Sequence, residues 1–354
     1  SVHVYKYRNS AWTQMGSTIY GTYGEDYFGG DSHRLSLSGD GKVLVVGALA
    51  SALYTNDDTR VYGYVNTYHY VNGDWVLFGE TSGYNTSVSI VPTTNHTSST
   101  LFGASVSTNN DGTVLAIGEY NNAGKGGIWR YNSSTDSWNN EFIFPYQTSG
   151  VGISKDGTRV VTGYEGSDIN VTNDGSLRVY NYNSSTQSWS QLGSTLTGYE
   201  EHDRVGYRVA ISGDGNTIVH CASNEDSSGN SFAQVYTYIQ AANGGNGDWV
   251  QKGTDFVGST STRYGWACKL DYDGDTVILG SPYYDVGRIY KYINDRWEQI
   301  GPDFTFGTSS GSSTALSDDG MTFAIGIANG VRGAAAAYIL SKVEEPMLKI
   351  QDGN

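Results

Sequence analysis

One stretch of sequence decides the fold: Asp40-Gly41-Lys42-Val43-Leu44-Val45-Val46-Gly47, an Asp-Gly pair followed by an apolar run that ends in glycine. The 354-residue chain contains six versions of this stretch, whose Asp-Gly glycines are Gly41, Gly112, Gly157, Gly215, Gly274 and Gly320. Six residues after each comes Gly47, Gly118, Gly163, Cys221, Gly280 or Gly326, so five of the six are glycine again. A unit that recurs every ~45–70 residues is typical of a propeller or a solenoid.

Each repeat divides into four short strands. Ahead of the Asp-Gly pair, apolar residues alternate as in a strand: Leu35/Leu37, Val151/Ile153, Val209/Ile211 and Cys268/Leu270, with weaker copies at Val106/Thr108 and Thr314/Leu316. The Asp-Gly pair predicts a tight hairpin, because glycine accepts the positive φ of such a turn. The apolar run after it predicts a second strand that is buried on both faces.

Aromatic residues mark the third and fourth strands. The third strand is rich in tyrosine, as in Val4-Tyr5-Lys6-Tyr7, Val179-Tyr180-Asn181-Tyr182 and Val235-Tyr236-Thr237-Tyr238. The fourth carries a tryptophan, at Trp12, Trp75, Trp138, Trp189, Trp249 and Trp297. Six of the eight tryptophans hold this one position, which favours rings packed between neighbouring sheets. The alternative is a ring of platforms for stacking sugars.

Four antiparallel strands in a radially repeated unit predict an all-β protein, a β-propeller with four-stranded blades. Six blades are favoured, seven remain open, and we expect pairing of the N- and C-terminal strands to close the ring. A parallel solenoid ranks lower, because Asp-Gly hairpins make antiparallel sheets. We expect one propeller domain over residues 1–340 and a C-terminal tail over 341–354.

A further pattern precedes the Asp-Gly pairs. Phe102-Gly103-Ala104-Ser105-Val106 stands ahead of Asp111-Gly112 and Ala116-Ile117-Gly118, and partial copies are Tyr264-Gly265 with Gly280-Ser281-Pro282, Val205-Gly206 and Phe306-Gly307. This pattern resembles the FG-GAP repeats of integrin-α-like propellers. The resemblance implies an extracellular propeller used for adhesion or assembly, and it brings no catalytic residues.

The resemblance also raises the question of calcium, since loops of that family often carry an Asp-x-Asp-x-Asp-Gly pattern. Only Asp271, Asp273 and Asp275 offer three carboxylates at alternate positions here. Calcium takes six to eight oxygen ligands, so the three side chains would be a partial site. The alternative is a hairpin turn with solvated acids. We expect no other cofactor.

Composition narrows the partners and the location. Charged residues make up 16% of the chain, and the formal net charge is −15. That charge argues against nucleic acid or an anionic membrane surface as a partner. No apolar stretch reaches the length of a membrane span, so membrane insertion is not expected. A polar but weakly charged surface suits an extracellular protein, secreted or at the cell surface; the first residue is Ser1, so a removed signal peptide is compatible with the chain.

Five sequons support that location: Asn85, Asn95, Asn132, Asn170 and Asn183. Asn132 and Asn183 begin the same motif, Asn-Ser-Ser-Thr-x-Ser-Trp, in two repeats. We place that motif at the turn between strands three and four, where a glycan could be carried.

The chain has two cysteines, Cys221 and Cys268. Both fall on predicted inner strands of adjacent blades, so a disulfide between them is geometrically feasible. The alternative is two buried thiols that pack as small hydrophobic groups.

No catalytic site emerges from the sequence. The one dense polar cluster is Glu200-Glu201-His202-Asp203-Arg204, in a loop that leads from strand four to the next strand one. Propellers often bind ligands on that face, so we take Glu200, Glu201, His202 and Asp203 as candidate ligand-loop residues. Acid–base work and a simple solvated loop are both compatible with them. The loop aromatics Tyr23, Tyr27, Tyr199, Tyr283 and Tyr284 are candidates for contacts with sugars.

The ends of the chain predict an irregularity. The N-terminus supplies only strands three and four, ending at Trp12, whereas residues 332–340 look like a strand three of the last repeat. Either the C-terminal residues finish the last blade, or a terminal segment completes a blade of another copy by strand exchange, which propagates into a filament when the rotation does not close.

The sequence therefore predicts a non-enzymatic extracellular glycoprotein with a structural or adhesive role, whose partners are copies of itself or other extracellular proteins and glycans. A carbohydrate-binding propeller is the first alternative. A propeller enzyme, such as a hydrolase or lyase built around the Glu200–Asp203 loop, is the second.

Overall fold

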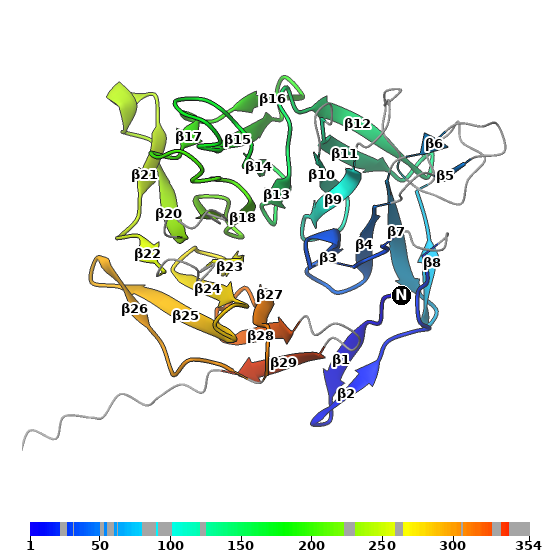
Figure 1. Cartoon of the computed structure of the whole chain (residues 1–354). Helices are drawn as coiled ribbons and strands as arrows, with labels where there is room; N and C mark the ends of the chain where they lie inside the picture. The colour runs from blue at the N-terminus through cyan, green and yellow to red at the C-terminus, as the bar shows by residue number, and fades with distance from the viewer. Residues whose placement is uncertain are drawn as a thin grey trace, which may run out of the picture.

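The computed structural model describes residues 1–21, 27–30, 32–49, 53–54, 60–61, 63–79, 90, 101–120, 125–222, 231–258, 265–305, 307–327 and 334–339. These residues form an all-β protein with two short 3-10 turns, η1 (Ser32–Arg34) and η2 (Asn243–Gly245). Antiparallel sheets are arranged around a common centre, which confirms the predicted β-propeller (Figure 1). In this part of the chain no helix is long and apolar enough to cross a membrane. The predicted tail at 341–354 lies outside the described residues.

Five sheets have the full four-strand order, and we call them blades I to V. Blade I consists of β3 (Leu35–Leu37), β4 (Val43–Ala48), β7 (Tyr64–Val71) and β8 (Asp74–Leu77). Blade II consists of β9 (Leu101–Thr108), β10 (Val114–Tyr120), β11 (Gly127–Asn132) and β12 (Ser137–Ile143). A short pair, β5 (Leu53–Tyr54) and β6 (Arg60–Val61), lies in the β4–β7 connection of blade I.

Blades III to V follow the same order. Blade III has β13 (Gly150–Ile153), β14 (Arg159–Tyr164), β15 (Ser176–Asn183) and β16 (Ser188–Gln191), with β17 (Leu196–Thr197) added on β15. Blade IV has β18 (Arg208–Ile211), β19 (Thr217–Ala222), β20 (Phe232–Ile239) and β21 (Asp248–Gln251), with β22 (Phe256–Val257) added on β20. Blade V has β23 (Ala267–Leu270), β24 (Thr276–Ser281), β25 (Val286–Ile293) and β26 (Arg296–Gln299).

The two ends of the chain do not pair as predicted. Blade VI has three described strands, β27 (Ser310–Leu316), β28 (Thr322–Ile327) and β29 (Ala334–Ile339). The N-terminal hairpin, β1 (Tyr5–Arg8) and β2 (Ala11–Gln14), forms a sheet of its own. The expected closure of the ring through the terminal strands is therefore not formed in the described residues. The reason is that β29 occupies the edge of β28 on which β1 would have to pair. Figure 1 shows the hairpin between blade VI and blade I.

The Asp-Gly turn is held by the same side-chain bonds in every blade. The residue three positions before the glycine accepts a hydrogen bond from the backbone N–H two positions after it, through Ser38, Asn109, Ser154, Ser212, Asp271 and Ser317. The aspartate accepts from the next N–H after the glycine, through Asp40, Asp111, Asp156, Asp214, Asp273 and Asp319. The glycine itself has φ between 67° and 74° in all six turns, which explains why it recurs.

The second recurring glycine lets adjacent blades approach closely. A Cβ on Gly47 would lie 2.1 Å from the carbonyl oxygen of Gly103 in blade II. The same holds for Gly163 against Gly206 at 2.2 Å. No side chain fits at such a distance, so the repeat needs glycine for packing between inner strands and not for its φ.

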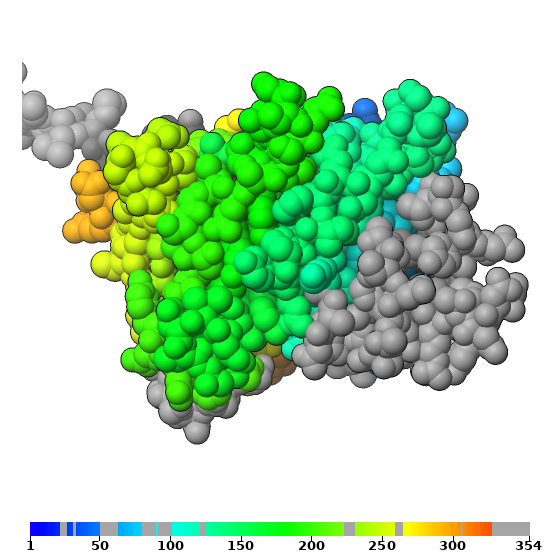
Figure 2. Space-filling model, turned by 90° about the horizontal axis from the view of Figure 1, so that it is seen from above, coloured from blue at the N-terminus to red at the C-terminus, as the bar shows by residue number. Residues whose placement is uncertain are grey.

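The repeated tryptophans pack between blades, as predicted. Trp75, Trp138, Trp189 and Trp249 are buried, and Trp297 is half-buried. Each indole N–H donates a hydrogen bond to the preceding blade or hairpin, for example from Trp249 to the carbonyl of Leu192 at 2.9 Å. Seen edge-on, the outer strands of neighbouring blades lie side by side along the rim (Figure 2). Trp12 is the exception, because 56% of its surface is exposed.

Candidate functional site

The described residues line an open cavity of about 460 Å³ where the inner-strand ends of blades I to IV meet. A volume of this size is within the usual range for a small-molecule site. Its walls come from the connections between strands two and three and between blades, the face on which the sequence placed the ligand loops. The lining residues used below are Arg34, Gln147, Glu165, Asn173, Arg204 and Arg208.

Two loops build one wall of the cavity, residues 165–175 after β14 and residues 198–207 before β18. Each is organised by a buried aspartate that accepts two backbone N–H groups: Asp174 from Ile169 and Asn170, and Asp203 from Tyr199 and Glu200. The backbones of the two loops are also joined, because the N–H of Arg204 donates to the carbonyl of Asn173 at 3.0 Å. The wall is therefore a fixed structure.

Three arginines from separate elements reach this cavity. Arg34 ends the 3-10 turn η1, Arg204 ends the loop before blade IV, and Arg208 begins β18. Arg208 is buried, and its guanidinium lies over the ring of Tyr207 at 4.2 Å and near that of Trp266 at 5.8 Å. Such cation–π contacts fix the side chain and keep its charge at the cavity.

One buried carboxyl faces these arginines. Glu165 directly follows β14 and accepts a hydrogen bond from the Ser149 hydroxyl. Burial raises the pKa of Glu165, while the Ser149 hydrogen bond and the charges of Arg208 and Arg204 lower it in part. With Glu165 ionised, the titratable arginine and glutamate side chains on the lining carry three positive charges and one negative charge.

The predicted ligand-loop residues separate into different roles. Glu200 and Glu201 are exposed, and His202 is half-buried with its Nδ1 3.4 Å from the Asn173 amide nitrogen. Asp203 is a structural cap of its loop. Arg204, the last residue of the cluster, is the one that lines the cavity.

The predicted loop aromatics that the structure describes are exposed. Tyr27, Tyr199, Tyr283 and Tyr284 have 53–73% of their surface accessible, and Tyr23 lies outside the described residues. None of them is on the cavity lining. The lining tyrosines are Tyr120, Tyr164 and Tyr207, which the sequence did not single out.

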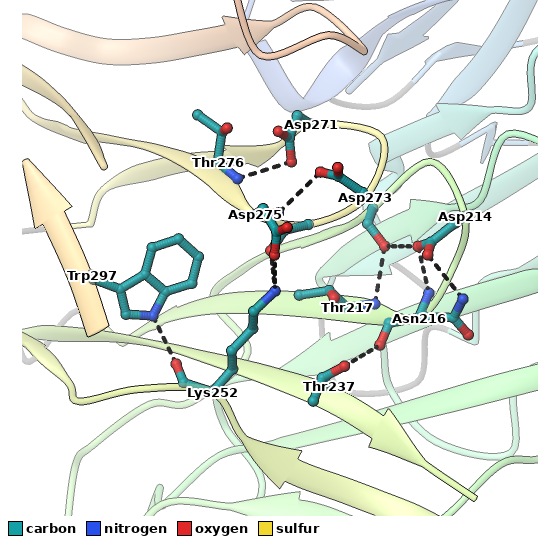
Figure 3. Close-up of polar contacts among 12 residues, drawn as sticks. Asp214, Asn216, Thr217, Thr237, Lys252, Asp271, Asp273, Asp275, Thr276 and Trp297 are labelled. Carbon is teal, nitrogen blue, oxygen red and sulfur yellow. Dashed lines mark hydrogen bonds and ion pairs between the residues drawn. The ribbon is translucent and has the colours of Figure 1, made fainter. Parts of the chain in front are cut away.

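The three calcium-candidate aspartates hold the Asp-Gly turn of blade V (Figure 3). Asp271 accepts the Thr276 N–H at 3.0 Å, where four of the other five blades use serine. Asp273 accepts the Asp275 N–H at 3.3 Å, and the Asp275 carboxylate pairs with the Lys252 ammonium at 2.5 Å. Burial raises the pKa of Asp271, and the neighbouring Asp273 raises it further, against the Thr276 hydrogen bond. Among the described residues no group of three acidic, cysteine or histidine side chains is arranged to hold a metal ion.

The two cysteines do come together, as free thiols in one apolar cluster between blades IV and V. Burial raises the pKa of the Cys221 thiol, and so does the neighbouring Cys268 thiol. Both side chains are at most 3% exposed.

Three of the five sequons are described, and all three lie at the surface or partly at it. Asn132 and Asn183 start equivalent turns, in which each amide oxygen accepts the N–H two residues on, at 3.0 and 2.9 Å. Asn170 is exposed in the loop after β14, and its amide donates to Thr197. Asn85 and Asn95 lie outside the described residues.

The cavity residues Arg34, Glu165 and Arg208 were missed by sequence reasoning. Glu165 and Arg208 did carry a signal, because each is a charged residue at the end of a buried inner strand. Arg34 carried the same signal as Arg208, because both stand seven residues before the Asp-Gly glycine of their repeat.

Comparison with known proteins supports the fold. No family model matches the chain, and no curated protein matches it. A Lactobacillus plantarum protein is 14% identical, with a TM-score of 0.58 over 94% of this chain and 88% of that one. The β-propeller domain of Cps50 (Swd1) from Myceliophteria thermophila is 10% identical, with a TM-score of 0.51 over 82% of this chain and 78% of that one. A functionally unknown protein from Desulfotomaculum acetoxidans is 11% identical, with a TM-score of 0.51 over 85% and 81%. At these identities the chain is a β-propeller by structural likeness, and the FG-GAP pattern stays a resemblance.

Proposed function

We propose that this chain is a non-enzymatic extracellular β-propeller, secreted or at the cell surface, with a structural or adhesive role, and that copies of it associate through the N-terminal hairpin. The observation that carries the proposal is the uncovered aromatic face of that hairpin, formed by Tyr5, Tyr7 and Trp12.

The hairpin has the packing geometry of a blade edge. Tyr7 and Trp12 lie 5.3 Å apart with their rings tilted by 54°. The five equivalent pairs, Tyr70–Trp75, Tyr131–Trp138, Tyr182–Trp189, Tyr238–Trp249 and Tyr292–Trp297, have separations of 5.1–5.4 Å and tilts of 50–58°. The hairpin is therefore shaped for the same cover that these pairs receive.

In four of the five blades, that cover is a glycine of the preceding unit, whereas for Trp189 of blade III the corresponding residue is Phe142. A Cβ on Gly16, Gly79, Gly193 or Gly253 would lie 2.3–2.8 Å from the next tryptophan ring. Each of these glycines lies four residues after the tryptophan of its own unit: Gly16 after Trp12, Gly79 after Trp75, Gly193 after Trp189 and Gly253 after Trp249. The hairpin thus covers Trp75 in the ordinary way through Gly16, while its own Trp12 has no such cover among the described residues.

Blade V carries the complementary feature. Gly301 also follows its tryptophan by four residues, but within the described chain a Cβ there would meet only the Phe304 ring, at 3.4 Å. Within the described residues the molecule thus presents both an exposed tryptophan, Trp12, and a glycine, Gly301, that no tryptophan ring covers. Association of Trp12 of one copy with Gly301 of the next would be head-to-tail, which extends into a filament when the rotation does not close.

The exposed aromatic patch of the N-terminal hairpin is comparable in area to functional patches on soluble proteins. Tyr5, Tyr7 and Trp12 are each 50–56% exposed. Together they leave on the order of 300 Å² of ring surface open to solvent. The largest apolar patch on a soluble monomer is typically about 300–600 Å² and is often functional.

The extracellular location is supported by composition and by the sequons. Asn132 and Asn183 occupy equivalent turns after the third strands of blades II and III, where Asn132 is half-buried and Asn183 is exposed. Secretion of the chain from a eukaryotic cell, followed by a mass decrease on treatment with an N-glycosidase, is the expected result. A secreted chain of unmodified mass would count against the glycoprotein part of the proposal.

The association is tested with the whole chain by sedimentation velocity and electron microscopy. We expect concentration-dependent oligomers for the unmodified chain and monomers for Trp12→Ser. The matched control is Tyr20→Ser, which removes another exposed aromatic, 71% accessible, and should behave as the unmodified chain. An unmodified chain that stays monomeric at every concentration would refute the association. Monomers that bind a glycan array would instead support the carbohydrate-binding alternative.

A further inference from the structure

We propose that the cavity at the meeting point of blades I to IV binds a small acidic sugar, a polyhydroxylated molecule with a carboxylate such as a uronic acid. The site is independent of the N-terminal hairpin. The proposal rests on the charge, the fixed geometry and the polar lining of the cavity.

The first step is charge. The chain as a whole carries a formal net charge of −15, yet the lining residues that the structure describes include three arginines, Arg34, Arg204 and Arg208, and one carboxyl, that of Glu165. Their separation along the sequence means that the fold gathers them. Guanidinium groups bind carboxylates through paired, charge-assisted hydrogen bonds.

The second step is rigidity. Arg208 is held over Tyr207, and the backbone of Arg204 is tied to Asn173. Groups that are already fixed lose little freedom on binding, so more of their interaction energy remains for the ligand.

The third step distinguishes a sugar acid from a bare anion. The amide oxygen of Gln147 is buried at the cavity and has no hydrogen-bond partner among the described residues. An unpaired buried acceptor is costly, and a ligand hydroxyl would satisfy it. The lining also offers Asn173 and the rings of Tyr120, Tyr164 and Tyr207. The amides can bind hydroxyl groups, the aromatic rings can contact the face of a sugar, and the arginines can bind a carboxylate. This combination matches a uronic acid better than phosphate or acetate.

The test is isothermal titration of the full-length chain with galacturonate and glucuronate as probes. Glucose lacks the carboxylate, acetate lacks the hydroxyls, and inorganic phosphate is an anion of another shape. We expect at least one uronate to bind ten-fold or more tightly than glucose, acetate and phosphate, with affinity falling as salt is raised. Failure of both uronates to bind, or equal binding of phosphate, overturns the proposal.

Variants locate the binding. Arg34→Gln and Arg204→Gln lie on different elements and are partly exposed, so both should fold, as circular dichroism would verify. Each should weaken uronate binding ten-fold or more. Glu165→Gln removes the one negative lining charge and should strengthen it. Arg296→Gln, an exposed arginine on the outer strand β26, is the matched control and should change nothing. Equal affinity in Arg34→Gln and Arg296→Gln would place the ligand elsewhere.

The two proposals fail separately. Trp12→Ser should abolish association and leave uronate binding intact, because Trp12 does not line the cavity. Loss of uronate binding in Trp12→Ser would mean that the cavity depends on assembly, and it would overturn the independence of this site.

Discussion

Replacing Asp271 by serine should stabilise the protein at neutral pH. Four of the other five Asp-Gly turns have serine at this position, where its oxygen accepts one backbone N–H and its hydroxyl donates to the turn aspartate. Asp271 accepts the backbone N–H as serine does, but its ionised carboxylate has no proton to donate to the turn aspartate. It instead places two carboxylates, Asp271 and Asp273, side by side in one turn.

The magnitude follows from burial. Asp271 is 5% exposed, and an imperfectly compensated buried polar group costs about 1–3 kcal/mol. Asp271→Ser removes that cost but loses a charged acceptor for the Thr276 N–H, so we expect a net gain of about 1 kcal/mol. In a chain of this size the gain corresponds to a rise in Tm on the order of 2 °C.

The pH dependence of the stability gain tests whether the ionised Asp271 carboxylate is its cause. The pKa of Asp271 is raised above the unfolded value of 3.8. A group with a raised folded pKa contributes stability that is present below its unfolded pKa and is lost as pH rises through its folded pKa. The advantage of Asp271→Ser should therefore be small near pH 4 and grow toward pH 7, measured by urea unfolding at both values. An equal gain at the two pH values, or a loss at pH 7, would refute the reasoning.

A reverse substitution and a calcium titration complete the experiment. Ser212→Asp recreates the two-carboxylate turn in blade IV and should destabilise the protein, most strongly at pH 7. Calcium should leave the Tm of the unmodified chain unchanged, because Asp271 and Asp275 already have protein partners. A rise in Tm with calcium that disappears in Asp271→Ser would contradict the turn interpretation and establish the calcium site.

Three further predictions concern single contacts. Burial lowers the pKa of His220 from 6.5 to about 4, so between these pH values the unfolded chain binds a proton that the folded chain does not. The free energy of unfolding should therefore fall by about 3 kcal/mol as the pH drops through that window. His220→Gln should remove this loss in urea unfolding at pH 7 and pH 4.5, and an unchanged dependence of stability on pH would contradict the prediction. Gly163→Ala should cost on the order of 3 kcal/mol because its Cβ would lie 2.2 Å from the carbonyl oxygen of Gly206 in the loop before blade IV. Gly73→Ala, which has positive φ but open space, should cost about 1 kcal/mol; equal losses would assign the effect to backbone strain. Trp249→Phe removes the indole N–H that donates to the preceding unit and should cost about 1 kcal/mol, while Trp12→Phe should leave the monomer's thermal unfolding unchanged.

The sequence was sufficient for the parts of the fold that repeat. Period-two alternation, the Asp-Gly pair and the apolar run each reflect a local requirement that every blade must meet, so six copies reinforce one another. The turn role of Asp271 was also open to prediction, because aligning the six turns places it opposite serine or asparagine. The spacing of the three acids alone leaves both a partial calcium site and a hairpin turn open.

The cavity could not be predicted in the same way. Glu165 and Arg208 are 43 residues apart in sequence; no other repeat has a charged residue at the position of Glu165, and only Arg34 matches Arg208 at its position. Their proximity depends on how adjacent blades are oriented around the centre, which no local pattern specifies. The expected closure of the ring is not formed in the described residues for a related reason: β1 resembles a third strand better than the alanine-rich β29 does, yet β29 follows β28 closely in sequence and pairs with it.

Departures from the repeat are where this chain carries its specific properties. A residue that recurs in every blade, such as the turn glycine or the packed tryptophan, is explained by the scaffold and needs no function. Two departures have no scaffold explanation: charged side chains at the inner-strand ends around the cavity, and a Tyr–Trp pair in the N-terminal hairpin whose tryptophan is 56% exposed. They lie on different elements and share no described contact, so binding and association should respond to different mutations. If Arg34→Gln abolished association while leaving the fold intact, this separation would be wrong, and the cavity would have to be understood as part of the assembly.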